Sequence, residues 1–271
     1  MASESTPTAA AGERVRHEML DEGRRLVDAA RAAGLTLRLL GGLAVREHCR
    51  TAALCARDYS DLDMVARAKQ AGRLAALLAD LGYAENDDVR VATGGAELQF
   101  VRPCLHSDGA GTGPAHADDH VDVFLDTFRM DHRIALARRL EIEPYTVSLS
   151  DLLLSKLQIF RLAEKDLRDI ITLLGDAEVG EEDAPGVING RYIGELCADD
   201  WGLFYDVASN LQRVAEGVAA FDLSEGQVAR VHGGVMRLIA AIDGAPKSLR
   251  WRLRARVGTR TTWHDQIDDQ E

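Results

Sequence analysis

The chain has 271 residues, a formal net charge of −12 and an apolar fraction of 46%. This length suits one large domain or two of moderate size, and the composition excludes a disordered or fibrous protein. The acidic balance argues against a surface that binds a polyanion over its whole extent. No apolar run approaches the ~20 residues of a membrane span, and no signal-like segment opens the chain, so we expect a compact protein of the cytoplasm with no membrane partner.

The first half of the chain predicts a small mixed sheet with flanking helices. Its apolar residues alternate in short runs or recur at helical spacing, and glycines stand between these runs. The predicted elements begin with a flexible tail over residues 1–12, a helix over 13–33 with Gly34 as its C-cap, a strand over 35–40, a helix over 43–50 and a strand over 61–65. They continue with a helix over 66–81, strands over 89–92 and 96–101 joined by a hairpin turn, a loop over 107–119 and a strand over 121–125. We therefore expect an α/β (α+β) fold with a core domain at residues 13–148.

The second half predicts helices alone. Residues 151–174 have continuous helical periodicity, with Ser148 or Ser150 as the N-cap. After a loop over 179–190, further helices are predicted over residues 191–198, 201–219, 224–241 and 247–257. Residues 149–271 are therefore expected to form an all-helical C-terminal domain. Its last helix is rich in arginine, which indicates either a solvated face or a surface for RNA or nucleotide phosphates.

The cysteines give no sign of a disulfide framework. Cys49, Cys55, Cys104 and Cys197 are widely spaced and form no CxxC pair. They also match no zinc-ligand spacing together with the nearby histidines. We therefore expect reduced thiols.

Two aspartates on one predicted strand are the first candidate for chemistry. Asp61 and Asp63 are two residues apart, so their side chains leave the same face of a strand about 6–7 Å from each other. Like charges this close repel unless a cation lies between them, and Mg²⁺ prefers hard carboxylate oxygens. Asp122, on the strand over 121–125, adds a third carboxylate, with Asp126 as the alternative at the end of that strand. Such a trio predicts a site for two metal ions and in-line phosphoryl or nucleotidyl transfer.

A glycine pair precedes these aspartates. Gly41 and Gly42 end a predicted strand and open a predicted helix. Glycines allow backbone amides to approach a phosphate at a helix N-terminus, where the partial positive charge favours an anion. A tight turn without a ligand is the other explanation.

These motifs together resemble a known family. The ordered set Gly41-Gly42-Leu43-Ala44-Val45, Asp61-Leu62-Asp63 and Val121-Asp122-Val123-Phe124 is similar to the signature of the DNA polymerase beta superfamily of nucleotidyltransferases. The helical run over 149–170 resembles the branch of AbiEii/MenT-type toxins of toxin–antitoxin systems. The resemblance covers residues 36–175. It implies that Asp61, Asp63 and Asp122 bind two magnesium ions, with manganese as an alternative, and that Asp122 also acts as, or orients, the base for an incoming hydroxyl.

The resemblance also implies a set of nucleotide-binding residues. Lys156 would reach the phosphates, and Asp166 and Asp169 would line the site, although their spacing also suits an exposed, salt-bridged helix face. Many members carry Gly-Ser where this chain has Gly-Gly, so we expect Arg46 and Arg57 to contribute to phosphate binding.

The implied activity is transfer of a nucleoside monophosphate from a nucleoside triphosphate, such as ATP, to a hydroxyl group, with release of pyrophosphate. The acceptor is RNA such as a transfer RNA, a protein or a small molecule. The alternative is a catalytically inactive binding protein or antitoxin-like partner of the same fold. The intact trio argues against that alternative, because clustered charges gain nothing without a metal.

Overall fold

The computed structural model describes residues 7–55, 61–101 and 120–265, with side chains from residue 19 onward. Helices and a small mixed sheet are both present, which confirms the predicted α/β class. The chain divides into two compact units, one of residues 1–47 with 56–126 and one of residues 48–55 with 127–271. In the described part of the chain no helix is both long and apolar enough to cross a bilayer.

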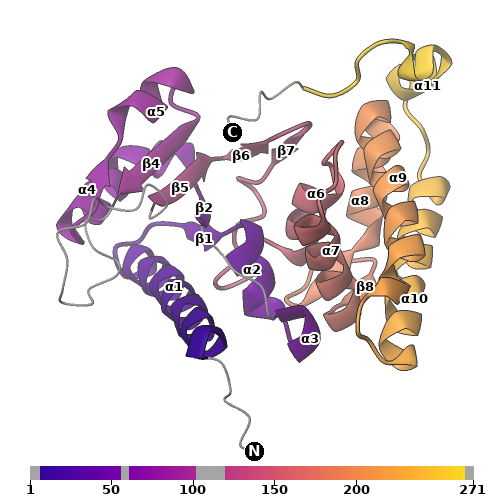
Figure 1. Ribbon diagram of the computed structural model, residues 1–271. Helices are drawn as coiled ribbons and strands as arrows, with labels where there is room; N and C mark the ends of the chain where they lie inside the picture. The colour runs from indigo at the N-terminus through magenta and orange to yellow at the C-terminus, as the bar shows by residue number, and fades with distance from the viewer. Residues whose placement is uncertain (1–6, 56–60, 102–119, 266–271) are drawn as a thin grey trace, which may run out of the picture. The chain divides into compact units, whose positions relative to one another are not determined.

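The first unit is built on a five-stranded mixed sheet with the strand order β1-β2-β5-β4-β3 (Figure 1). The strands are β1 (Leu37–Leu39), β2 (Leu62–Ala66), β3 (Ala84–Glu85), β4 (Glu97–Val101) and β5 (His120–Leu125). Only the β2–β5 pair is parallel among these described neighbours, and its register places Asp63 opposite Asp122. Alternation buries Val121 and Val123 on one face of β5 and leaves His120, Asp122 and Phe124 half-buried on the other.

The helices of the first unit cover this sheet. They are α1 (Pro7–Ala32), α2 (Gly41–His48), the 3₁₀ turn η1 (Ala68–Gln70), α4 (Ala71–Asp80) and α5 (Asp87–Ala92). Leu26 and Val27 of α1 are fully buried, because this helix packs on β1. It begins at Pro7, earlier than the predicted residue 13, and ends before Gly34, whose positive φ of 67° suits the predicted C-cap.

The strand predicted over residues 89–92 is wrong, since these residues belong to α5. The Asn86 side chain accepts a hydrogen bond from the amide of Asp88 and caps the helix. Acidic residues in the first turn also suit the positive end of the helix dipole. An alternating run of four residues is too short to outweigh these capping interactions.

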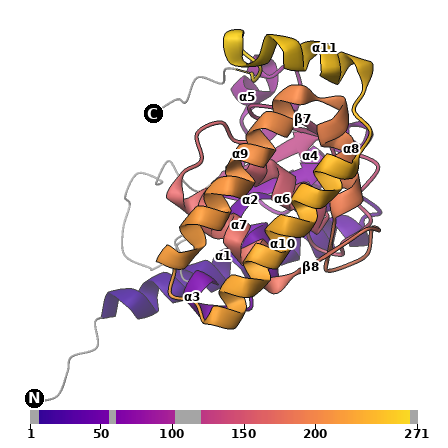
Figure 2. The ribbon, with the colours of Figure 1, turned by 90° about the vertical axis from the view of Figure 1, so that its right-hand side faces the viewer.

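The second unit contains mainly helices. They are α3 (Ala52–Cys55), α6 (Leu149–Leu157), α7 (Glu164–Asp176), α8 (Gly190–Asp199), α9 (Trp201–Gly217), α10 (Glu225–Gly244) and α11 (Leu249–Val257), with the 3₁₀ turns η2 (Val218–Ala220) and η3 (Gly258–Arg260). Helix α8 packs closely on α10 at Gly194. A Cβ atom at this residue would lie 2.5 Å from the carbonyl oxygen of Ala241, so the close approach needs a glycine. Helices α9 and α10 lie side by side (Figure 2).

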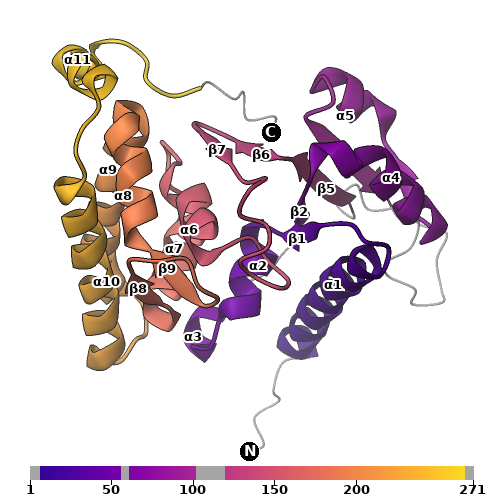
Figure 3. The same ribbon diagram turned by 180° about the vertical axis from the view of Figure 1, so that it is seen from behind.

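Two short pairs of strands also belong to the second unit, and the second pair corrects the expectation that residues 149–271 are all helical. They are β6 (Thr127–Arg129) with β7 (Arg133–Ala135), and β8 (Glu178–Gly180) with β9 (Val187–Asn189). The second pair lies beside α10 within the predicted loop over 179–190 (Figure 3). The division after Asp126 also differs from the predicted boundary at residue 148, because Ile134 and Leu136 are buried with the second unit.

The helical run predicted over residues 151–174 is divided into two helices, and of its two candidate N-caps Ser148 is confirmed. Helix α6 ends at Leu157 and α7 begins at Glu164. The Asn210 side chain donates hydrogen bonds to the carbonyl oxygens of Leu157 and Ile159, at 2.9 and 2.7 Å. Because a distant side chain satisfies these backbone groups, the chain can leave the helix there.

The segment that opens the second unit is fixed by a disulfide and by a carboxylate. Cys49 and Cys55 are bonded, with 5.8 Å between their Cα atoms, so the expectation of reduced thiols is wrong for this pair. The turn at α3 brings them together, and Asp176 accepts hydrogen bonds from the amides of Arg50 and Thr51. Cys197 is a buried free thiol whose pKa is raised to about 12 by burial. The other cysteine, at position 104, lies outside the described residues.

His48 gives the second unit a pH-dependent contact. Its Nε2 atom lies 2.8 Å from Thr146 Oγ1. Burial, followed by the charge of Arg50, lowers the pKa of His48 to about 4. The folded state therefore holds this ring neutral while the unfolded chain protonates it near pH 6.5.

We expect His48→Gln to lower the stability of the protein most at pH 7.5. A lowered folded-state pKa contributes stability that is complete above pH 6.5 and is lost as the pH falls towards 4. The difference in free energy of unfolding between wild type and variant, from urea titrations, should therefore shrink by about 1–3 kcal/mol between pH 7.5 and 4.5. A difference that stays constant over this range would contradict a neutral His48.

Candidate active site

Polar side chains gather on one face of the central strands of the first unit. Asp63 in β2 lies between the buried Leu62 and Met64 and pairs with Asp122 in β5. Residues paired across neighbouring strands project from the same face. The structure therefore brings Asp63 and Asp122 side by side, and Asp61 stands exposed just before β2.

A glycine turn lies directly against the Asp63 carboxylate. Gly41 has a φ of 65°, and a Cβ atom built on it would lie 2.0 Å from Asp63 Oδ2. The amide of Leu40 donates to the backbone oxygen of Asp63 at 2.8 Å, which fixes the turn to β2. Residue 41 must therefore be glycine both for its backbone conformation and for this close approach.

The turn opens helix α2, which carries one of the two predicted arginines. Gly42 is half-buried in the first turn of this helix. Arg46 follows four residues later, also half-buried, and in the described part of the chain it makes no hydrogen bond or ion pair. The other arginine, Arg57, lies outside the described residues.

Two further side chains hold Asp122. Gln99 Nε2 donates to Oδ1 of this carboxylate at 2.9 Å, and His120 Nε2 lies 3.0 Å from Oδ2. The hydrogen bond to Asp122 raises the pKa of His120 to about 9 against the opposing effect of burial. The negative charges of Asp122, Asp61 and Asp63 add to this shift. His120 is therefore an imidazolium at neutral pH.

Sequence reasoning missed His120 and Gln99. His120 stands two residues before Asp122, which is the same spacing as between Asp61 and Asp63. Gln99 could be found only from the register of β4 against β5, which pairs it with Asp122. Glu97 lies two residues before Gln99, and burial, with a smaller effect of Asp122, raises its pKa.

The carboxylates of this face are chemically the type of ligand that a hard divalent cation prefers. Carboxylate oxygens are the ligands of Mg²⁺ and Mn²⁺, and His120 shows that positive charge is already drawn to this face. Within residues 7–55, 61–101 and 120–265, however, no three His, Cys, Asp or Glu side chains form a group that could hold a metal. In the described residues the side chains of Asp61, Asp63 and Asp122 are therefore not gathered into the predicted metal-binding trio.

Asp126 does not serve as the alternative third carboxylate. It has a positive φ of 61° and has left the strand geometry of β5. Its Oδ1 accepts a hydrogen bond from the amide of Ala68 at 3.1 Å. The side chain therefore supports the turn at η1.

The predicted nucleotide-binding residues of the second unit form an ion-paired cluster within that unit. Lys156 Nζ in α6 lies 2.9 Å from Asp166 Oδ1 and 3.1 Å from Asp169 Oδ2, both in α7. These carboxylates are only 6% and 2% exposed, so an exposed salt-bridged helix face is the wrong explanation for them. Burial alone would lower the pKa of Lys156, but the charges of Asp169 and Asp166 raise it.

Comparisons with known proteins give little further guidance. No protein-family model matches the chain, and no curated protein matches it. The solution structure of the antibiotic-resistance factor ANT(2'')-Ia matches with a TM-score of 0.31 and 12% identity, over 90% of this chain and 94% of that chain. A similarity this low shows neither a shared fold nor a shared activity.

We expect Gly41→Ala to destabilise the protein more than Gly34→Ala. Both glycines have a positive φ, but only at residue 41 would the new methyl group meet another side chain. Alanine should cost about 1 kcal/mol at residue 34 and about 2–4 kcal/mol at residue 41, where Asp63 must move. Urea unfolding measures both values, and equal losses would show that Asp63 does not lie against this turn.

Proposed function

We propose that the protein transfers a nucleoside monophosphate from a nucleoside triphosphate to a hydroxyl group in the cytoplasm, with release of pyrophosphate. The observation that carries this proposal is the in-register pairing of Asp63 with Asp122, with the Gly41 turn packed against Asp63. This arrangement places two carboxylates beside the N-terminus of a helix, where backbone amides attract phosphate.

Each residue of this face has a proposed role. Asp63 and Asp122, with Asp61, would hold magnesium or manganese, in two positions if both ions bind. The metal would neutralise the triphosphate and orient its phosphates. The amides at Gly41 and Gly42 would contact phosphate oxygens, and Arg46 and Arg57 would add positive charge.

The chemical step is an in-line displacement at phosphorus. The acceptor oxygen forms a bond to the α-phosphorus while the bond to the pyrophosphate oxygen breaks, and the pyrophosphate leaves with that electron pair. The hydroxyl proton passes to the Asp122 carboxylate, which Gln99 keeps in position. The role of Lys156, Asp166 and Asp169 in nucleotide binding stays a prediction. In the structure the Lys156 ammonium is paired with the two carboxylates.

A second candidate function is a metal-free binding protein of the same fold. The observation that favours it is the pair of contacts from His120 and Gln99, which satisfy Asp122 without a metal. The two candidates differ in one measurable property. Only the enzyme transfers nucleotide, and only the enzyme depends on a divalent cation for it.

We expect Asp63→Asn and Asp122→Asn each to reduce nucleotidyl transfer at least about 100-fold, because each removes a carboxylate that the metal needs. The assay combines α-labelled nucleoside triphosphates with Mg²⁺ or Mn²⁺ and three acceptor pools, namely transfer RNA, protein and small molecules such as antibiotics. Asp126→Asn is the control and should stay active, because that side chain bonds to Ala68 at a turn.

The wild-type result separates the candidates. Labelled acceptor and pyrophosphate release support the enzyme, and the labelled pool identifies the acceptor. Nucleotide binding without transfer in any pool would support the binding protein. Full activity of Asp63→Asn would contradict the assigned site.

We expect His120→Asn to strengthen metal binding. Removing the imidazolium leaves the carboxylates without a positive neighbour. A divalent cation then binds to them without competition from the charge of His120. The rise in melting temperature on adding Mn²⁺ should therefore be larger for His120→Asn than for wild type, and absent for the double variant Asp63→Asn, Asp122→Asn. A smaller rise for His120→Asn would show that His120 is itself a metal ligand.

A further inference from the structure

Helix α11 exposes a row of aliphatic side chains within the part of the chain that the structure describes. Leu249, Leu253 and Val257 are spaced by four residues and are 72%, 54% and 40% exposed. Four-residue spacing places them in one ridge that covers about 80° of the helix circumference. Single exposed leucines are common on protein surfaces, but an aligned ridge of three on one short helix is an exposed apolar patch.

The opposite face of α11 is firmly attached to the second unit. Trp251 packs edge to face on Phe204, with 5.2 Å between ring centroids, and the Arg254 guanidinium lies 4.8 Å from the centre of the Trp201 ring. The Ser248 side chain caps the helix by accepting from the Trp251 amide. Figure 2 shows α11 lying across the ends of the neighbouring helices, which include its contacts α8 and α9.

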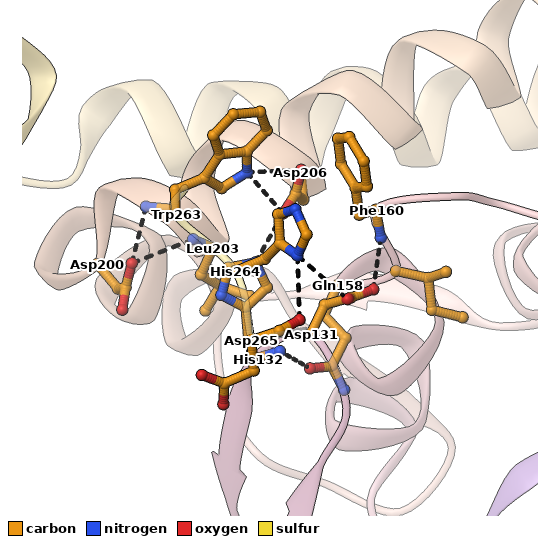
Figure 4. A network of polar contacts seen from close by, with 12 residues as sticks. Asp131, His132, Gln158, Phe160, Asp200, Leu203, Asp206, Trp263, His264 and Asp265 are labelled. Atoms are coloured by element: carbon orange, nitrogen blue, oxygen red, sulfur yellow. Dashed lines mark hydrogen bonds and ion pairs between the residues drawn. The ribbon is translucent and has the colours of Figure 1, made fainter. Parts of the chain in front are cut away.

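The segment after α11 is held equally well. Trp263 Nε1 donates to the Asp206 carboxylate, which also lies 2.7 Å from His132 Nε2, and His264 stacks on Phe160 (Figure 4). Arg254 also donates to the carbonyl oxygens of Gly258 and Thr261 behind the helix. With both ends fixed, the ridge faces solvent in one orientation.

Arginines flank this ridge on both sides. At 100° per residue, Arg252 and Arg256 lie on one side of it and Arg250 on the other. All three are exposed, and none makes an ion pair or hydrogen bond in the part of the chain that the structure describes. The chain as a whole carries a net charge of −12, so general solubility does not require this local concentration of positive charge.

We propose that the outer face of α11 binds an acidic amphipathic helix of a partner protein. A ridge of residues four apart packs into the groove of a second helix, as in ordinary helix–helix packing. Carboxylates beside the partner's apolar row would face the flanking arginines, as the charged positions do in coiled coils. This inference does not depend on the proposed nucleotidyl transfer.

The geometry favours this occupant over three others. A single-stranded nucleic acid would need exposed aromatic rings for base stacking, but Trp251 is on the inner face. A membrane surface suits a broad apolar face, whereas this ridge is narrow and bounded by arginines on both sides. A second α11 helix would bring arginines against arginines, which is unfavourable.

The test uses the full-length protein and a fluorescein-labelled helical peptide with leucine at every fourth position and glutamate on both sides of that row. A matched peptide has glutamine in place of glutamate. Fluorescence anisotropy should show saturable binding of the acidic peptide, at least about tenfold tighter than the glutamine peptide and weaker at high salt. Leu253→Ser, and separately Arg252→Gln with Arg256→Gln, should each weaken it at least about tenfold.

Met236→Ser with Arg237→Gln is the matched control, because both residues are exposed on α10 outside this face, and it should bind as wild type does. Circular dichroism and melting curves confirm that the variants fold, as expected for exposed positions. Parallel titrations use phosphatidylserine–phosphatidylcholine vesicles and a uridine oligonucleotide, and sedimentation measures self-association. The proposal is overturned if the acidic peptide does not bind, if the glutamine peptide binds equally well, or if Leu253→Ser abolishes only vesicle binding, oligonucleotide binding or a dimer.

Discussion

The parallel pairing of β2 with β5 sets the electrostatics of the polar face of the first unit, because its register places Asp63 directly beside Asp122. Neighbouring strands are about 5 Å apart, and two carboxylates at that distance repel by about 3 kcal/mol at an effective dielectric constant of about 20. The surrounding residues are arranged to offset this repulsion. His120 supplies positive charge, Gln99 supplies a hydrogen bond, and the absence of a side chain at Gly41 leaves room for the Asp63 carboxylate.

The second unit balances charge in a different way. Lys156 is permanently positive and lies between Asp166 and Asp169, so this cluster keeps its own cation and ties α6 to α7 across the break between them. His120 is more exposed, with 24% of its side chain accessible, and a histidine can give up its proton or turn away. A buried lysine held by two carboxylates has neither option at low cost. This difference in exposure is why the proposal assigns the metal to the carboxylate face of the first unit and not to the Lys156 cluster.

Features set by local pattern could be predicted from the sequence, whereas features set by distant contacts could not. The alternation around Asp63 and Asp122 placed both strands correctly, and the glycines marked the turn that packs on Asp63. The break after α6 depends on Asn210, some fifty residues away along the chain, and no periodicity reveals such a partner. For the same reason the sequence does not reveal the role of His120, because that role depends on its contact with Asp122, which the spacing alone does not establish.

The arginine-rich end of the chain shows why a run of like charges is not one surface. Arg254 turns inward onto Trp201 and the backbone, while Arg250, Arg252 and Arg256 remain outside with the aliphatic ridge. Charge separated from a contact by more than about 8–10 Å is largely screened at physiological ionic strength. The net charge of −12 therefore has little influence on what docks against α11, and the local arginines and leucines decide it. The acidic composition that argues against a polyanion-binding protein is thus compatible with one short basic helix that recognises an acidic partner.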